Sequence, residues 1–371
     1  MLIVERVVLE TIRMRLKQAF RISSGVSEER RIVLVRLVTA DGTGVGECVA
    51  GEEPNYSYET VDTALLMIEQ HLAPAILGLE FPGPRELAHA LTRAIRGHPM
   101  ARAALEMAAW HVEAQQRDVS LATLLGGEKD RVEVGVSIGL QPSVDSLLRE
   151  MQGYVDQGYR RVKLKISPGH DIEFVRHARD AFPELALQVD ANAAYGVNDI
   201  EHLRRLDACG LLMIEQPFPE DDLLTHAKLQ RQMETPICLD ESVGSAAECE
   251  AALALGAAGV VNIKPGRVGG LGEAIRIHDV CANAGVPVWC GGMLETGIGR
   301  AYNVALASLP NFRYPADLSA SERYWDRDVV EPPFTLEPDG TILVPRRTGL
   351  GTEIDERFLD GLREDYRELE A

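Results

Sequence analysis

The sequence predicts an α/β protein: an eight-stranded (β/α) barrel with an α+β domain attached to it. The first observation is that charged residues recur at one interval along the middle of the chain. Lys165, Asp190, Glu215, Asp240 and Lys264 are separated by 25, 25, 25 and 24 residues. Each ends or directly follows a short apolar run, and the interval has the length of one strand, one helix and two loops. The second observation is that segments rich in β-branched residues lie outside this repeat, at both ends of the chain.

The first 127 residues predict the α+β domain. Residues 4–16 and 30–49 are rich in β-branched residues and predict antiparallel strands, with Asp41-Gly42 as a hairpin turn. The polar segment 16–29 between them predicts a loop long enough to move. Residues 57–125 show the spacing of apolar residues that is typical of helices.

Residues 128–320 predict the barrel. Seven helical stretches separate eight strand candidates, which is the pattern of a modified TIM barrel, (β/α)7β. The strands are almost wholly apolar apart from their ends, as in a parallel sheet that helices cover on the outside. The eight candidates begin near Val132, Arg161, Leu185, Leu211, Pro236, Gly259, Pro287 and Phe312.

Residues 321–371 predict a second α+β segment. Residues 334–345 read as a hairpin with Asp339-Gly340 at its turn. The economical expectation is that this tail returns to the first 127 residues and completes a domain that caps the barrel.

The composition excludes several classes of partner. The net charge is −19 and no basic stripe stands out, so neither nucleic acid nor an anionic membrane surface is an expected partner. The six cysteines form no CxxC pair and lie in apolar segments, which indicates buried thiols in a reducing compartment. Charges come too early for a signal peptide, and no run of 18 apolar residues exists. We therefore expect a cytoplasmic protein.

Three acidic residues predict a metal site. Asp190, Glu215 and Asp240 end the third, fourth and fifth predicted strands, whose carboxyl ends open on one face of a barrel. Three oxygen ligands without His or Cys suit Mg²⁺, or Mn²⁺, rather than Zn²⁺. A single acid after a strand is often only a turn or capping residue. Three in succession at constant spacing favour the metal.

Three lysines predict proton transfer. Lys163 and Lys165 alternate along one strand, so both point into the barrel. Their repulsion and partial burial should lower the pKa of one of them, which suits a general base. Lys264 ends the sixth strand, opposite the second, so Lys165 and Lys264 should face each other across metal and substrate. The alternative for each is a surface lysine at a strand end.

Residues near the other strand ends are candidate site residues. Asn192 could orient a lysine or a ligand, and Glu241 is a candidate ion-pair partner of Lys264. Arg267 could contact a distal anionic group of the substrate. The glycine-rich loop after the seventh strand could bind a substrate carboxylate with backbone N–H groups. The predicted substrate contacts are Ser137, Asn192, Arg267, Gly292 and Met293.

A divalent cation between two lysines suits removal of a proton next to a carboxylate, with the metal stabilising the enediolate. The motifs KLK at Lys163, DAN at Asp190, EQP at Glu215, DES at Asp240 and IKPGRVGG around Lys264 resemble the enolase superfamily, muconate-lactonizing enzyme subgroup. MARAALEMAAW, YRRVKLKI, KPGRVGG and VWCGGMLETGIGRA resemble o-succinylbenzoate synthases that also racemise N-acylamino acids.

The resemblance implies roles for these residues. Asp190, Glu215 and Asp240 would ligate Mg²⁺. Lys165 would be the base for syn dehydration to o-succinylbenzoate, in the menaquinone pathway, while Lys264 stabilises the intermediate by a cation–π contact. Both lysines would transfer protons in racemisation, and Lys163 would tune Lys165 and touch the substrate carboxylate.

The resemblance also implies that the loop from Phe20 to Gly25 closes over a small carboxylate substrate, and that the chain forms a homo-oligomer. Ala19 stands where close relatives are expected to have proline, which leaves loop shape and substrate preference open. A dedicated N-succinylamino acid racemase, a dipeptide epimerase and a muconate cycloisomerase are alternatives. A non-catalytic metal-binding barrel is the alternative of another class, but it has no need of opposed bases.

Overall fold

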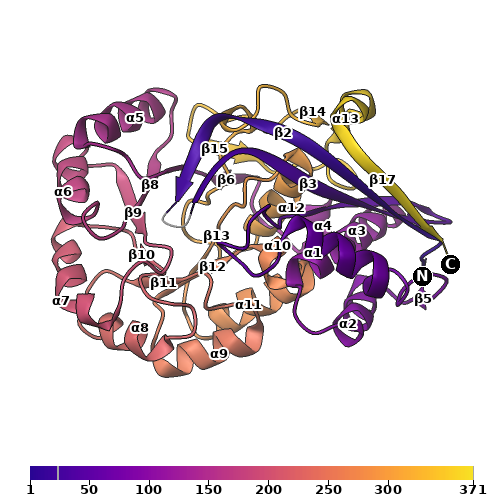
Figure 1. The fold of residues 1–371 in the computed structure, drawn as a ribbon, viewed down its shortest axis with the longest axis horizontal. Coiled ribbons are helices and arrows are strands. Elements are labelled where there is room, and N and C mark those ends of the chain that lie inside the picture. The colour runs from indigo at the N-terminus through magenta and orange to yellow at the C-terminus, as the bar shows by residue number, and fades with distance from the viewer. Residues whose placement is uncertain (23–24, 371) are drawn as a thin grey trace.

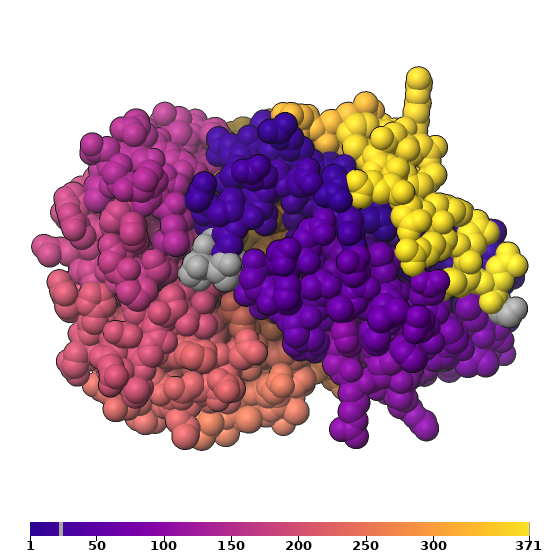
Figure 2. All heavy atoms as spheres, viewed as in Figure 1, coloured from indigo at the N-terminus to yellow at the C-terminus, as the bar shows by residue number. Residues whose placement is uncertain are grey.

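The computed structural model describes residues 1–22 and 25–370. A curled parallel sheet with helices on its outside lies beside an antiparallel sheet and helices from the start of the chain (Figure 1). The space-filling view shows the two regions in broad contact, with the C-terminal tail along the N-terminal region (Figure 2). The predicted fold class is confirmed. The domain boundaries at 127/128 and 320/321 stay a prediction.

The barrel sheet holds its strands in chain order, each parallel to the next. Register aligns Lys165 with Asp190, and Asp190 with Glu215, so the charged strand ends lie side by side. The strands are β7 (Val136–Ile138), β8 (Arg161–Lys165), β9 (Ala186–Asp190), β10 (Ile214–Glu215), β11 (Ile237–Leu239), β12 (Val260–Ile263) and β13 (Val288–Cys290). The helices are α5 (Val144–Asp156), α6 (Ile172–Ala181), α7 (Ile200–Leu203), α8 (Leu223–Gln230), α9 (Ala246–Leu255), α10 (Pro265–Val268), α11 (Leu271–Asn283) and α12 (Gly297–Ala307).

The eighth predicted strand is an irregular segment that joins both edges of the curled sheet. Phe312 pairs with Val288 at one edge, and Ala316 pairs with Val134 at the other, both parallel. Pro315 lies between these contacts, and because proline has no N–H it interrupts a regular ladder. The segment still places Asp317 at the same end of the barrel as the other charged residues, since its N–H donates to Cys290 O at 2.8 Å.

Two predicted strands pair differently from expectation. The first predicted barrel strand is split: β6 (Arg131–Glu133) pairs antiparallel with β15 (Thr341–Leu343), and the barrel strand itself begins only at Val136. The predicted hairpin at 334–345 is therefore wrong, because its second half pairs with β6. Gly135 separates β6 from β7 where a Cβ would lie 2.4 Å from Arg161 O, so no larger residue fits this turn.

The antiparallel sheet has the order β17-β2-β3-β4, so the tail returns to the start of the chain. Gly44 and Gly46 on β4 let α3 approach closely, since a Cβ would lie 1.9 to 2.0 Å from carbonyl oxygens of that helix. The strands are β2 (Arg6–Ile22), β3 (Gly25–Thr39), β4 (Gly42–Cys48) and β17 (Arg363–Glu370). The helices of this region are α1 (Val61–Met67), the π-helical Ile68–Leu72, α2 (Pro84–Ala94), α3 (Pro99–Gln116) and α4 (Leu121–Leu125).

Smaller elements complete the chain. They are β1 (Leu2–Ile3), β5 (Glu80–Phe81), β14 (Val330–Glu331), β16 (Glu353–Ile354), α13 (Glu356–Leu362) and three 3₁₀ segments, Val197–Asp199, Arg204–Cys209 and Ser321–Arg323. All six cysteines are free and buried, as predicted. In the described ranges, 1–22 and 25–370, no helix combines the length and the apolar character needed to cross a membrane.

The predicted loop at 16–29 is a long hairpin instead. Strands β2 and β3 continue to Ile22 and Gly25, with a register irregularity between Arg15 and Phe20. Residues 23 and 24, at the centre of the predicted mobile loop, lie outside the described residues. The hairpin reaches across the open end of the barrel (Figure 1). Its end contacts the barrel where Leu140 N donates to Arg21 O at 3.4 Å.

One buried carboxylate joins the two regions and predicts a pH-dependent stability. Glu47 on β4 accepts hydrogen bonds from Thr296 N and Gly299 N, at the start of α12. Burial, with the nearby charge of Glu295, raises the pKa of Glu47 to about 7 despite these bonds. The folded protein therefore holds a proton that the unfolded chain releases from its usual pKa of 4.5 upward, so stability falls as pH rises through this window.

We expect the free energy of unfolding to fall by about 2–3 kcal/mol more in the parent than in Glu47→Gln between roughly pH 5 and pH 8. Urea unfolding of both proteins at each pH measures this difference. Parallel pH profiles for the two proteins would contradict it.

Candidate active site

The three predicted acidic residues end neighbouring strands. Asp190 and Glu215 are the last residues of β9 and β10, and Asp240 directly follows β11. Each is at most 1% exposed, which is costly for three carboxylates unless cations neutralise them. They therefore form an anionic floor at the carboxyl end of the barrel.

The three predicted lysines supply those cations. Lys163 Nζ lies 3.1 Å from Asp190, 3.2 Å from Glu215 and 3.0 Å from Asp317. Lys165 Nζ lies 2.6 Å from Asp190 Oδ2, and Lys264 Nζ lies 2.6 Å from Asp240 Oδ2. The structure thus brings all six predicted metal-binding and catalytic residues together, with Lys165 and Lys264 on different acids of the same floor.

The pKa shifts follow from this pairing. Burial alone would lower the pKa of Lys163, but the carboxylates of Asp317, Glu215 and Asp190 raise it well above its usual value. The predicted lowering by Lys163–Lys165 repulsion is thus wrong for Lys163, because three acids outweigh one neighbouring cation. Burial also raises the pKa of Lys264 less than Asp240 does in the opposite sense, so its net pKa lies well above normal.

The acids respond in two ways. Burial opposes ionisation of Asp190, yet Lys165 and Lys163 hold its pKa below the usual value. Asp240 is lowered in the same manner by Lys264 and Arg267, against the effect of burial. Glu215 differs: burial and the charges of Asp190 and Asp240 outweigh Lys163 and raise its pKa to about 8. Without further positive charge the floor therefore favours keeping one proton.

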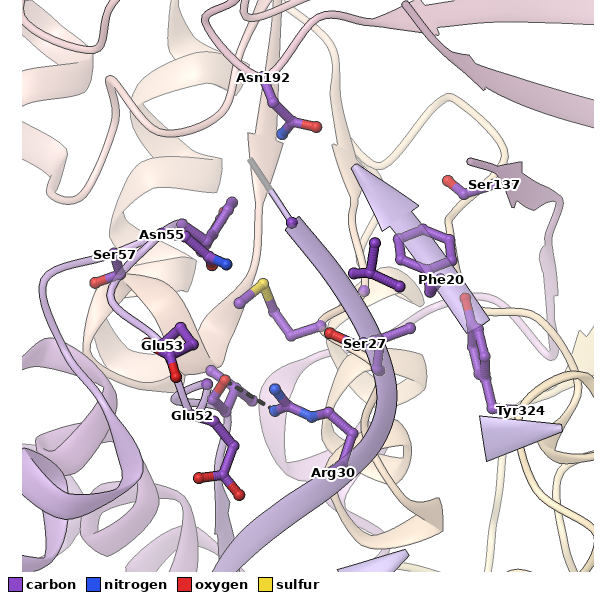
Figure 3. A pocket seen from close by; sticks show the side chains of 18 of the residues that line it. Phe20, Ser27, Arg30, Glu52, Glu53, Asn55, Ser57, Ser137, Asn192 and Tyr324 are labelled. Carbon is purple, nitrogen blue, oxygen red and sulfur yellow. Dashed lines mark hydrogen bonds between the residues drawn. The ribbon is translucent and has the colours of Figure 1, made fainter. Parts of the chain in front are cut away.

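A cavity of about 350 Å³ lies above this floor. The three lysines open onto it from the barrel, and Phe20 and Tyr56 line it from the N-terminal region. In Figure 3, Asn192 and Ser137 of the barrel and Phe20 of the hairpin surround the same space. Five predicted substrate contacts line the cavity: Phe20, Ser137, Asn192, Gly292 and Met293.

Two predicted residues make other contacts. Arg267 is buried behind Asp240, with Nε 3.2 Å from Asp240 Oδ1, and donates to the carbonyl oxygens of Val243 and Asn262. It does not line the cavity, so the predicted contact with a distal anion is wrong. Glu241 accepts a hydrogen bond from Asn192 Nδ2 at 3.0 Å and forms no ion pair with Lys264, whose acid partner is Asp240.

Three residues of the site escaped the sequence analysis. Asp317 binds Lys163 and accepts a hydrogen bond from Ser137 Oγ at 2.6 Å. Asn262 donates to Glu215 Oε1 at 2.7 Å, and Tyr56 donates to Asp240 Oδ2 at 3.2 Å. Asn262 was detectable, because it lies two residues before Lys264 and so shares its side of the strand. Tyr56 carried no such signal, since its contact spans 184 residues of sequence.

Two family models together match most of the chain. The model for the mandelate racemase / muconate lactonizing enzyme N-terminal domain matches residues 4–126, and the "enolase C-terminal domain-like" model matches residues 146–358. The chain belongs to the enolase superfamily. The predicted membership is confirmed.

Individual enolase-superfamily proteins are similar over almost the whole chain. The o-succinylbenzoate synthase of Geobacillus kaustophilus is 49% identical over 96% of this chain and 95% of its own length. The N-succinylamino acid racemase of Amycolatopsis sp is also 49% identical, over 95% of each chain. A solved superfamily member from Listeria innocua has a TM-score of 0.96 and 40% identity, with 100% of both chains covered.

Enolase-superfamily members generally bind Mg²⁺, and the donor set fits that ion. Asp240 Oδ1 and Glu241 Oε2 are buried without a hydrogen-bond partner. Among the described residues no three His, Cys, Asp or Glu stand grouped as a formed metal site, and lysines bind the carboxylates instead. Asp190, Glu215 and Asp240 are the residues that would hold the ion, because their oxygens converge on one floor.

Asp317 predicts a large stability effect. Its carboxylate pairs with Arg161, 0% exposed, and with Lys163, 3% exposed. Asp317→Ala leaves both cations buried with less compensation, so we expect a loss of about 3–5 kcal/mol of unfolding free energy, measured by urea denaturation. Asp317→Asn, which keeps the side-chain volume and an acceptor for Ser137, is the control and should lose less. Equal stability of Asp317→Ala and the parent would contradict the prediction.

Proposed function

We propose that this chain is an o-succinylbenzoate synthase that also racemises N-succinylamino acids. The observation that carries the proposal is the pair Lys165 and Lys264, bound to different acids of one floor and both open to the same cavity. Relatives with both names are equally similar to the chain, at 49% identity. Both reactions begin with loss of a proton next to a carboxylate.

The substrate is a small-molecule carboxylate. A divalent cation held by Asp190, Glu215 and Asp240, Mg²⁺ or Mn²⁺, would supply a Lewis acid for the negative charge that develops on that carboxylate. Lys163 remains a cation, because its acid partners raise its pKa well above normal. It is therefore suited to attract the substrate carboxylate, while Lys165 is the group that takes the proton.

The two reactions then differ in what the lysines do next. In racemisation, a proton taken from one face of the carbon by one lysine is replaced from the other face by the second lysine. In syn dehydration the proton and the hydroxyl leave from the same face, so Lys165 can take the one and protonate the other. Lys264 then needs only to stabilise charge from the opposite side.

The proposal is tested by incubating the protein with Mg²⁺ and N-succinyl amino acids in D₂O, and by assaying the cyclohexadiene precursor of o-succinylbenzoate in parallel. We expect deuterium at the α-carbon, loss of optical activity, and dehydration of the cyclohexadiene. Absence of both deuteration and dehydration would refute the proposal.

A dedicated N-succinylamino acid racemase is the second candidate, because the Amycolatopsis relative of that name is as similar as the synthases. Racemisation without dehydration in the same assay would favour it. The muconate cycloisomerase and dipeptide epimerase alternatives have less support. Asp317, the acid at the last barrel segment, is occupied by Lys163 and Arg161, which leaves no free carboxylate there for a dipeptide amino group.

The proposal extends to the cellular context. We propose that the protein serves menaquinone biosynthesis in the cytoplasm, where its six free thiols would stay reduced. A homo-oligomer is also part of the proposal, and light scattering of the purified protein tests it. Restoration of menaquinone in cells that lack an o-succinylbenzoate synthase tests the pathway, and failure to restore it would leave racemisation as the role.

A further inference from the structure

A tyrosine from the N-terminal region reaches the base of the barrel site. Lys264 Nζ donates to the Tyr56 hydroxyl at 2.9 Å, and that hydroxyl donates to Asp240 Oδ2 at 3.2 Å. Lys264 Nζ also donates to Asp240 Oδ2 at 2.6 Å, which closes a triangle of three polar groups. The Lys264 nitrogen is 4.8 Å from the Tyr56 ring centroid, so its close contact is with the hydroxyl and not with the ring face.

The segment that carries Tyr56 is anchored at both ends. Gly51 bridges to Thr60, and Val61 N donates to Gly51 O at 2.8 Å, so residues 51–60 form a closed loop. Glu59, 1% exposed, accepts from Met100 N at 2.8 Å and Ala101 N at 3.0 Å at the start of α3. These bonds fix Tyr56 to the helix of the N-terminal region.

The backbone of Lys264 is held by the same region. Lys264 directly precedes α10, whose four residues are buried. A Cβ on Gly266 would lie 2.8 Å from both methyl groups of Val49, so α10 packs tightly on the end of the N-terminal sheet. The N-terminal region thus touches Lys264 at both its backbone helix and its ammonium group.

Lys165 is supported differently. Among the described residues its ammonium group contacts Asp190 and Asn192, and it makes no polar contact with residues 1–127. Asp190 and Asn192 both belong to the barrel, on β9 and directly after it. Only one of the two opposed lysines therefore depends on the N-terminal region for its position.

We propose that Tyr56 is a positioning residue for Lys264, so that the N-terminal region sets the proton transfer on one face of the substrate only. This inference rests on the racemisation proposed above. A hydrogen bond to a charged group limits the positions that the group samples. Without the hydroxyl, Lys264 keeps Asp240 as its partner but loses the contact that directs it into the cavity.

The test compares Tyr56→Phe with Tyr58→Phe. Tyr58 is 61% exposed on the same loop, and its hydroxyl accepts from His98 N away from the cavity, so it is a matched control. The measurement is the rate of α-deuterium exchange for each enantiomer of one N-succinyl amino acid in D₂O with Mg²⁺, over a range of pH. Lys264→Ala identifies the enantiomer whose exchange depends on Lys264.

We expect Tyr56→Phe to slow exchange of that enantiomer by about 10-fold to 100-fold, with exchange of the other enantiomer within about 2-fold of the parent. Tyr58→Phe should match the parent for both. An equal loss for both enantiomers would assign Tyr56 a general structural role and overturn the inference, and so would unchanged rates. No exchange of either enantiomer by the unaltered protein would instead refute the proposed racemisation, on which the inference depends.

Discussion

Lys264→Ala is expected to abolish racemisation and still exchange the α-proton of one enantiomer. The variant retains Lys165, bound to Asp190 at 2.6 Å, so proton transfer on that face persists. The opposite face loses its acid/base group, which typically supplies about 10²–10⁴-fold of the rate. Polarimetry measures the racemisation, and NMR of the α-proton in D₂O measures the exchange.

Lys165→Ala should show the complementary result. It should lose exchange of the other enantiomer and also lose dehydration, because Lys165 performs both proton steps of a syn elimination. Lys228→Ala, an exposed lysine on α8, is the control for a lost positive charge. Full racemisation by either active-site variant would contradict the two-base arrangement.

Removal of the divalent cation is expected to suppress both reactions, by about 10²–10⁴-fold, since stabilisation of transition-state charge by a metal contributes several kcal/mol. Dialysis against EDTA followed by addition of Mg²⁺ or Mn²⁺ measures the loss and its recovery. Glu215→Gln should require far more cation for recovery, because one of three carboxylate ligands is gone.

The matched control for Glu215→Gln is Glu295→Gln. Glu295 is also buried, but its carboxylate accepts from Met293 N and Asn303 Nδ2, away from the three acids. Glu295→Gln should show the parent's Mg²⁺ requirement even if its stability changes. Activity that survives EDTA unchanged would contradict a metal site on the three acids.

Much of the site was predictable because of strand geometry. Parallel neighbours in a barrel align their carboxyl ends, so residues spaced by one strand–helix unit must come together. Lys165, Asp190 and Glu215 are aligned in the observed register for this reason. Alternation along a strand likewise predicted that Lys163 joins them, 3.1 Å from Asp190.

The direction of side chains beyond the strand ends was not predictable. Arg267 and Glu241 follow the charged residues closely in sequence, yet one turns behind Asp240 and the other binds Asn192. Their conformations depend on which buried carbonyl or amide groups need partners, and those groups come from other segments. The hairpin at 334–345 failed for a similar reason, since β6 offered its second strand a longer pairing partner.

The sequence by itself determined the barrel, the acidic floor and the lysines on it, because all of these follow from a periodic pattern within one segment. Only the tertiary structure decided what lies over that floor. Tyr56 reaches Lys264 across 208 residues, and Asp317 reaches Lys163 by closing the barrel. Such contacts depend on the packing of separate domains and on the closure of the sheet, and neither leaves a local pattern in the chain.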